Sequence, residues 1–282
     1  MKLTSVEIHA PNFSTIITLS FRDPMRQDQY NVKSIVGLDA DEIISKYYAM
    51  SSDSKTKFNT LVIAKREVVF SVALNPAFDQ NQSYSDLRDT LYKMISSSRS
   101  GQIQLWFKNG DVTIAILYGF ITKFETPQTE QVPDVKLTIK CDEPFLIAPD
   151  PVNIPVGGIS LSGFTIQDDQ STATHGFKFQ IHFTASVSGP ITITDPYDSS
   201  WFFTINPPLV FLSGDVLTFS SEYNNRYLID TRASGTVSHM ADSIVTGSSW
   251  PIIFPGTNNF RFSQTANMVL DSLSHSYHYW GV

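Results

Sequence analysis

Few residues of this sequence are of the types that carry covalent chemistry, and Cys141 is the first of them. It is the single cysteine, so an intrachain disulfide and a multi-cysteine metal site are both excluded. In VKLTIKC, residues 135–141, apolar and polar residues alternate, and Cys141 is in phase with the apolar side. A thiol at such a position packs as a small hydrophobic group. We predict that Cys141 is structural, with a catalytic Cys–His pair as the less favoured alternative.

The strongest candidates for metal ligands are His275 and His278, in the segment SHSYHYW. A spacing of three would place both on one face of a helix, but the segment has the pattern of a strand, in which the two face opposite sides. No third ligand is evident, so the sequence predicts no metal site and no cofactor. We interpret His182 as a solvent-facing residue of a strand, and Asp168 with Asp169 as a turn.

Motifs of common enzyme classes are missing from the sequence. It has no G-x-S-x-G elbow, no phosphate-binding P-loop and no dinucleotide fingerprint. Glu125 and Glu130 flank a polar hairpin tip, where carboxylates are usually solvated. Trp201 and Trp250 are candidate sugar contacts, but both stand beside apolar strand segments, which favours packing in a core. We therefore predict that the protein is not an enzyme and has no catalytic residues.

The elements that must position these residues are mostly strands. Residues 103–107 and 112–120 alternate apolar and polar positions on either side of Asn109-Gly110, which predicts a hairpin with a type I′ turn. One amphipathic helix is expected over about residues 84–97, with Ser83 as its N-cap and Asp86 three residues on. The segment of about residues 38–62 has no stable period between strand-like flanks, and we interpret it as a protruding arm.

After Pro155 the strands become shorter, richer in Phe and Thr, and separated by frequent turns, which predicts a β-sandwich. Glu143-Pro144 ends the preceding strand because proline has no N–H to donate. The segment APDPVNIP, residues 148–155, reads as a stiff connector. We predict two domains, residues 1–147 and 148–282, joined by a linker with four prolines: Pro144, Pro149, Pro151 and Pro155.

Charge and composition narrow the function further. The chain has 282 residues and a net charge of −7, which is unsuited to gripping phosphate backbones. Charged residues make up only 17% of the chain, so much of the surface must be neutral or buried against partners. The N-terminus lacks an apolar signal segment, and no run of 18 apolar residues occurs. We expect a protein that folds in a cytoplasm without membrane insertion and acts through assembly.

The motifs resemble those of the distal tail (Dit) family of long-tailed bacteriophages, which form the hub ring at the tail tip. In the first half the resemblance rests on SIVGLDADEI leading through the arm to KREVVFSVAL, on SYSDLRDTLYKMISS before GQIQLWFKNG, and on GFITKFETPQTEQVPDVKLTIKCDEPFL. In the second half it rests on FLSGDVLTFSSEYNNRYL and WPIIFPGTNNFRF. The order and spacing of these segments carry the resemblance, which covers nearly the whole chain.

This resemblance implies an all-β fold with one helix. The N-terminal domain would be a tail-tube-like β-sandwich or split barrel, and the C-terminal domain a galectin-like β-sandwich. Six copies would form a ring in which the arm acts as a belt around the neighbouring subunit. The belt residues implied to contact that subunit are Tyr47, Tyr48, Met50, Lys55 and Phe58.

The partners implied are five further copies, the ring of the tail tube protein, the tail hub protein, and a receptor-binding protein or tail fibres. DNA would pass through the channel without specific binding, and the protein would belong to the virion tail tip after assembly in the host bacterial cytoplasm. A baseplate component of a contractile tail, which would form a ring in the same way, is a closely related possibility. Neither the host, the receptor nor the partner of the C-terminal domain follows from the sequence.

Two other functions remain open at this point. The alternative is a carbohydrate-binding adhesin at the tail tip, which would use the C-terminal domain with Trp201 and Trp250. The sequence departs from sugar-binding galectins, however, because EYNNRYL and Trp250 do not reproduce their His-x-Asn-x-Arg strand and stacking tryptophan. A hydrolase of cell-wall polymers would need a cleft with paired carboxylates. For residues 275–282, we favour packing on the C-terminal domain.

Overall fold

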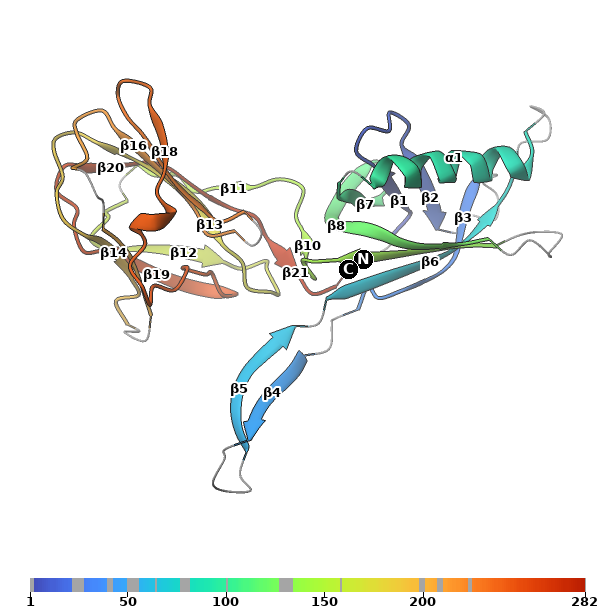
Figure 1. Cartoon of the computed structure of the whole chain (residues 1–282), viewed down its shortest axis with the longest axis horizontal. Coiled ribbons are helices and arrows are strands. Elements are labelled where there is room, and N and C mark those ends of the chain that lie inside the picture. The colour runs from blue at the N-terminus through green and yellow to red at the C-terminus, as the bar shows by residue number, and fades with distance from the viewer. Residues whose placement is uncertain are drawn as a thin grey trace. The chain divides into compact units, whose positions relative to one another are not determined.

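A computed structural model describes residues 3–21, 28–39, 43–49, 56–63, 65–76, 82–99, 101–126, 134–157, 159–197, 201–206, 210–222 and 225–281, with only the backbone described over 43–49 and 56–63. The chain divides into two compact units, which are treated separately below (Figure 1). Unit 1 comprises Met1–Pro149 and Trp280–Val282, and unit 2 comprises Asp150–Tyr279. Of residues 275–282, which the sequence favoured as part of the C-terminal domain, 275–279 belong to unit 2 and Trp280–Val282 belong to unit 1.

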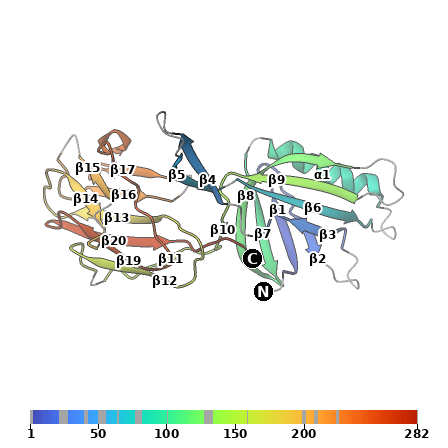
Figure 2. The same cartoon turned by 90° about the horizontal axis from the view of Figure 1, so that it is seen from below.

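Unit 1 is a closed barrel of seven strands. Their order is β8-β7-β1-β2-β3-β6-β9, and β9 pairs with β8 to close the circle (Figure 2). The sequence left a sandwich and a split barrel as alternatives for this domain. The pairing of β8 with β9 shows that the sheet closes into a barrel. The strands are β1 (Ser5–His9), β2 (Ile17–Phe21), β3 (Tyr30–Val36), β6 (Arg66–Leu74), β7 (Ile103–Asn109), β8 (Val112–Glu125) and β9 (Asp134–Cys141), and a short β10 (Leu146–Ile147) pairs with β8.

The barrel has one weak seam, between β2 and β3. These two strands run parallel and pair over only Ser20↔Asn31 and Phe21↔Val32. The other neighbouring strands of the barrel pair antiparallel over longer registers. Inward-facing side chains fill the barrel because apolar residues alternate along each strand, as in β6, where Val68, Phe70 and Val72 are buried.

The predicted helix is confirmed as α1 (Tyr84–Ser98). Its N-cap Ser83 forms a capping box with Asp86, which satisfies two backbone N–H groups that the first turn leaves free. Hydrogen bonds from the Ser83 side chain and then from its backbone hold the pKa of Asp86 below its ordinary value. The helix buries Leu87, Leu91 and Met94.

The hairpin between β7 and β8 differs in detail from the prediction. Asn109 pairs with Val112, so the two connecting residues are Gly110 and Asp111 rather than Asn109 and Gly110. Of these, Gly110 alone has a positive φ, of 61°. A positive φ confined to the first connecting residue is typical of a type II′ turn, so the predicted type I′ turn is wrong. The strand phase of residues 135–141 is confirmed, and Cys141 is fully buried.

Unit 2 is a sandwich of two antiparallel sheets. One sheet has the order β11-β20-β13-β16-β17-β18, and the other β12-β19-β14-β15. The strands are β11 (Val152–Asn153), β12 (Phe164–Asp168), β13 (Phe177–Phe183), β14 (Ile191–Thr194), β15 (Phe202–Ile205), β16 (Val216–Ser220), β17 (Tyr227–Thr231), β18 (Val237–His239), β19 (Gly256–Phe262) and β20 (Met268–His275). A two-residue strand, β21 (His278–Tyr279), follows β20.

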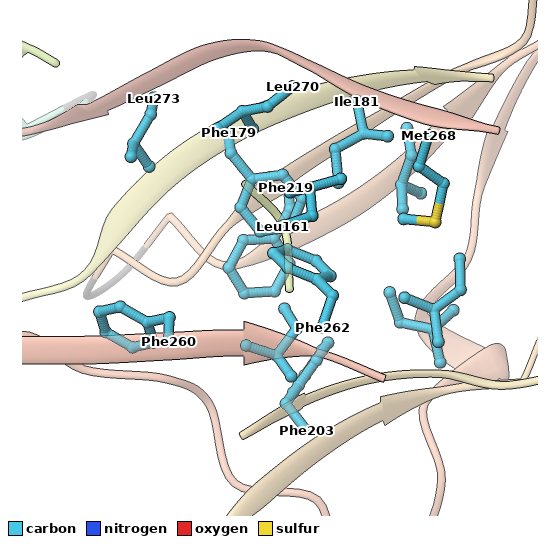
Figure 3. Close-up of a cluster of buried hydrophobic side chains, with 14 of the residues drawn as sticks. Leu161, Phe179, Ile181, Phe203, Phe219, Phe260, Phe262, Met268, Leu270 and Leu273 are labelled. Carbon is cyan, nitrogen blue, oxygen red and sulfur yellow. The ribbon is translucent and has the colours of Figure 1, made fainter. Parts of the chain in front are cut away.

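The core of unit 2 is rich in phenylalanine (Figure 3). Phe179 and Phe219 stack with their ring centres 4.6 Å apart, and both come from the larger sheet. Phe203 and Phe262 approach them from the smaller sheet, with Phe203 5.2 Å from Phe219 and Phe262 5.5 Å from Phe179. These aromatic contacts between the sheets confirm the predicted sandwich.

Candidate assembly site: the arm and its base

The segment predicted to be an arm contains a hairpin of two strands, β4 (Ile43–Ala49) and β5 (Thr56–Ile63). The strands pair antiparallel and form a sheet of their own, which shares no ladder with any other strand in the described part of the chain (Figure 1). The outer edge of each strand therefore carries main-chain N–H and C=O groups that no described strand satisfies. Such edges are templates for pairing with another chain.

The residues expected to contact a neighbour fall on this hairpin or beside it. Tyr47 and Tyr48 lie in β4, where they pair with Phe58 and Lys57 of β5. Met50 and Lys55 lie outside the described residues.

A glycine marks the place where the chain leaves β3 toward the arm. Gly37 has a φ of +90°, which L side chains rarely adopt. A Cβ atom added there would also lie 2.0 Å from the backbone oxygen of Glu67, on the strand that returns from the arm. The two chain segments at the base of the arm can therefore approach this closely only because residue 37 has no side chain.

Arg66, the first residue of β6, joins three separate segments in unit 1. Its side chain is fully buried, and its Nη2 donates to the backbone oxygen of Asp39, at 3.2 Å, and to that of Trp280. The Trp280 ring meets Phe145 edge-on, with ring centres 5.0 Å apart. One guanidinium thus holds together both sides of the arm base and the end of the chain, which explains why the last residues belong to unit 1.

The role of Arg66 was not predicted from the sequence, although a signal for it is present. In REVVFSVAL, Arg66 is in phase with Val68, Phe70 and Val72, so it faces the interior. An arginine at an inward position must find acceptors there, because an unpaired buried charge is costly. Its exposed neighbour Lys65 forms an ordinary surface pair with Asp142 at 2.6 Å.

The four linker prolines are placed differently from one another. Pro144 is buried in unit 1 and precedes β10, whereas Pro149 is the last residue of unit 1 before the boundary. Pro151 and Pro155 are exposed in unit 2 and flank β11, which pairs with β20. The stretch from Pro144 to Pro155 therefore contains a short strand of each unit, β10 and β11.

Both candidate sugar-contacting tryptophans are partly buried against the core of unit 2. Trp201 meets Phe260 edge-on, with ring centres 6.1 Å apart. Trp250 lies 4.9 Å from Phe203 on one side, and the Arg226 guanidinium lies 5.8 Å from its ring centre. These contacts agree with the interpretation that the indoles contribute to packing.

A buried polar cluster in unit 2 was not anticipated from the sequence. Asp168, interpreted there as part of a turn, instead ends β12 with its side chain fully buried and 2.8 Å from Nε2 of His175. Burial alone would raise the pKa of Asp168, but hydrogen bonds from the Ser171 backbone and the His175 ring bring it below its ordinary value. The ring of His175 stacks on His275 at 5.0 Å and lies 5.2 Å from that of His278.

Two histidines of this cluster are held neutral. Burial, followed by the nearby charge of His175, lowers the pKa of His275 to about 4 and that of His278 to about 3. Backbone bonds also tie the strand end to the loop after β12, since the His278 carbonyl accepts from the N–H groups of Thr172 and Ala173. Within the described ranges, no group of three or more His, Cys, Asp or Glu side chains could hold a metal ion.

A second buried network surrounds Asp215, the residue directly before β16. Asp215 accepts hydrogen bonds from the backbone N–H groups of Leu212 and Ala233, and its Oδ2 lies 2.6 Å from Nη1 of Arg232. Arg232 also pairs with Asp230 at 2.8 Å. The carboxylate of Asp215 therefore fixes the ends of the β16–β17 hairpin from inside the fold, which is a structural rather than a catalytic use.

None of the helices found in the described residues is both long and apolar enough to span a bilayer. No known family model matches the chain, and no curated protein matches it.

Solved structures do match. The crystal structure of SPP1 Dit (gp 19.1), described as a paradigm of the hub adsorption apparatus in phages that infect Gram-positive bacteria, has a TM-score of 0.62 and 12% sequence identity, covering 96% of this chain and 99% of that chain. The phage P2 baseplate in its activated conformation with Ca has a TM-score of 0.49 and 8% identity, covering 100% of this chain and 100% of that chain. The phage p2 baseplate in its activated conformation with Sr has a TM-score of 0.47 and 8% identity, covering 96% of this chain and 97% of that chain. The chain therefore has the fold of a phage Dit hub protein.

Proposed function

We propose that this protein is a structural component of a phage tail tip, where copies of it form a ring that joins the tail tube to the tail hub. The observation that carries the proposal is the match to SPP1 Dit over 96% of the chain. The hairpin of β4 and β5 supports it, because no described strand pairs with its outer edges, which can offer main-chain groups to a neighbouring subunit. Unit 1 would build the ring, and unit 2 would be the galectin-like module attached to it.

A ring of six subunits agrees with the chemistry of the chain. A ring needs two different, complementary surfaces on each subunit, and the arm provides one of them. Six copies would carry a charge of six times −7, or −42. A strongly acidic assembly does not trap passing DNA, since retention on phosphate backbones depends on Lys and Arg. We further propose Tyr47, Tyr48, Met50, Lys55 and Phe58 as the arm residues that contact the neighbouring subunit.

The test is the oligomeric state of the purified full chain, measured by light scattering with negative-stain microscopy. We expect ring-shaped particles whose mass is a multiple of 31.5 kDa, with six copies for the proposed ring. A monomer at all concentrations, both alone and mixed with a tail tube protein, contradicts the proposal.

The same preparation tests the adhesin alternative. Trp201 and Trp250 pack against the core of unit 2, so we expect no saturable change in tryptophan fluorescence when saccharides of the host surface are added. A saturable change that is lost on replacing either tryptophan with phenylalanine would instead assign sugar binding to unit 2.

A further inference from the structure

Unit 1 contains a groove between β2 and α1, with a volume of about 480 Å³. One wall is the β2 side, with Ile16, Thr18 and Ser20, and the other is the start of α1, with Leu87 and Thr90. The hydroxyl of Tyr30, the first residue of β3, donates to the backbone oxygen of Leu87 at 3.2 Å. This contact fixes the wall formed by α1 against the barrel.

The wall formed by β2 exposes a free strand edge. The Phe21 N–H donates to the Thr4 carbonyl at 2.9 Å, and residues of an antiparallel strand alternate the edge to which their N–H and C=O groups point. Ile17 and Leu19 therefore bond toward β1, and Thr18 points its backbone groups to the opposite edge, on the groove side. On that edge β3 reaches only Ser20 and Phe21, so no described strand pairs with β2 beside Thr18.

The side chains around this edge also suit an added strand. Ile16 is 50% exposed, and the Thr18 side chain is exposed as well. Among the described residues that line the groove, Asp28 is the only ionisable side chain apart from the bonded hydroxyl of Tyr30. The described part of the groove thus offers main-chain pairing, an exposed apolar residue and the carboxylate of Asp28.

The arm has the complementary properties. β4 and β5 have seven and eight residues, and the outer edge of each is free in the described structure. Residues 43–63 contain Lys46, Lys55 and Lys57 against the single acid Asp53, so this segment is cationic in a chain whose net charge is −7. A cationic segment with free strand edges matches a groove that has a free edge and one carboxylate.

We propose that the arm of one copy enters the groove between β2 and α1 of a neighbouring copy and adds a strand to the free edge of β2 beside Thr18. The inference rests on the proposed ring function and names the surface that receives the arm. The pairing would complete the weakest seam of the barrel, where β2 and β3 share only two residue pairs.

The test is a cross-link between two singly substituted chains of different mass. A tagged chain with Thr18→Cys is mixed with untagged chains carrying Tyr48→Cys or Lys57→Cys, which face each other across the hairpin. The native Cys141 is fully buried and does not compete. The matched control replaces Thr18→Cys with Val112→Cys, because Val112 is 66% exposed in the same unit but lies away from the groove.

We expect a heterodimeric band on a non-reducing gel for Thr18→Cys with at least one arm partner, at least tenfold stronger than for Val112→Cys. Rings that assemble without this cross-link would overturn the docking site but leave the ring function standing. Absence of both rings and cross-link would overturn the two proposals together.

A second variant tests the backbone pairing itself. Thr18→Pro removes an N–H that points toward the groove, and a proline is tolerated at a free strand edge because it removes no ladder bond there. We expect Thr18→Pro to lower ring formation at least tenfold with unchanged thermal unfolding of the monomer, and Thr18→Ala to leave both unchanged. Full ring formation by a folded Thr18→Pro variant would overturn strand addition at this edge.

Discussion

The two units use their polar groups in opposite ways. Unit 2 buries them, in the cluster of Asp168 with three histidines and in the network of Asp215 with Arg232, and each contact fixes a loop or a hairpin inside the fold. Unit 1 leaves main-chain groups unpaired by any described strand, on the arm and on the edge of β2. We propose that unit 2 uses these buried contacts to hold its own loops, whereas the arm and the edge of β2 in unit 1 are completed by other chains.

The largest expected effect comes from removing the arm. Deleting residues 49–57 shortens both strands of the hairpin and their free edges. We expect the ring to be lost while the monomer keeps a cooperative thermal transition, because the hairpin shares no ladder with the barrel. Light scattering and circular dichroism measure the two properties. Rings that persist after the deletion would show that assembly uses another surface.

Acid should destabilise unit 2 more than unit 1, because the buried histidines lie in unit 2. In the unfolded chain His275 and His278 bind protons near pH 6.5, but in the folded state only near 4 and near 3. The unfolded state therefore takes up more protons, and stability falls as the pH drops from 6.5 to about 4 for His275 and to about 3 for His278. Since one pKa unit corresponds to ~1.4 kcal/mol, the loss is several kcal/mol.

The measurement is urea unfolding of unit 2 between pH 7 and pH 4, followed by the fluorescence of Trp201 and Trp250. The variant His275→Phe keeps a buried ring without the titratable nitrogen, so it should show a shallower pH dependence than the parent. An equal slope in both proteins would show that His275 does not carry the effect.

A smaller effect is expected at the base of the arm. Arg66→Met keeps most of the side-chain volume but leaves the carbonyls of Asp39 and Trp280 without this donor. Unpaired buried acceptors cost about 1–3 kcal/mol each, so we expect unit 1 to lose ~2 kcal/mol and its arm base to become more sensitive to proteases. The control Lys65→Met removes an exposed ion pair and should change stability by less than about 1 kcal/mol.

Local patterns explain how much of this fold could be predicted. The alternation in VKLTIKC placed Cys141 in the interior, and the Ser83–Asp86 spacing located the start of α1, because both depend on residues close in sequence. The closure of β8 with β9 and the seam between β2 and β3 depend on register and barrel curvature, which no short segment specifies. The cluster of Asp168, His175, His275 and His278 could not be predicted either, because its members are up to 110 residues apart and no short segment contains them all.

The candidate assembly site was likewise predictable only where local sequence specifies it. The arm was visible as a segment without a period between two strands, whereas the receiving edge beside Thr18 was not, because a free edge is defined by the strands that fail to reach it. The role of Arg66 combined a local signal, its inward phase, with a distant partner, Trp280. Phase alone indicates that an arginine is buried but does not identify the groups that accept its hydrogen bonds.

The proposed contrast, in which other chains complete unit 1 but not unit 2, is tested most directly by hydrogen exchange, compared between dilute monomer and assembled protein. Amides gain protection where they enter new main-chain bonds. We predict that protection on assembly concentrates in residues 43–63 and around Thr18, and that β13 and β20 in unit 2 remain unchanged. Protection confined to unit 2, or none in either strand of the arm, would contradict this account.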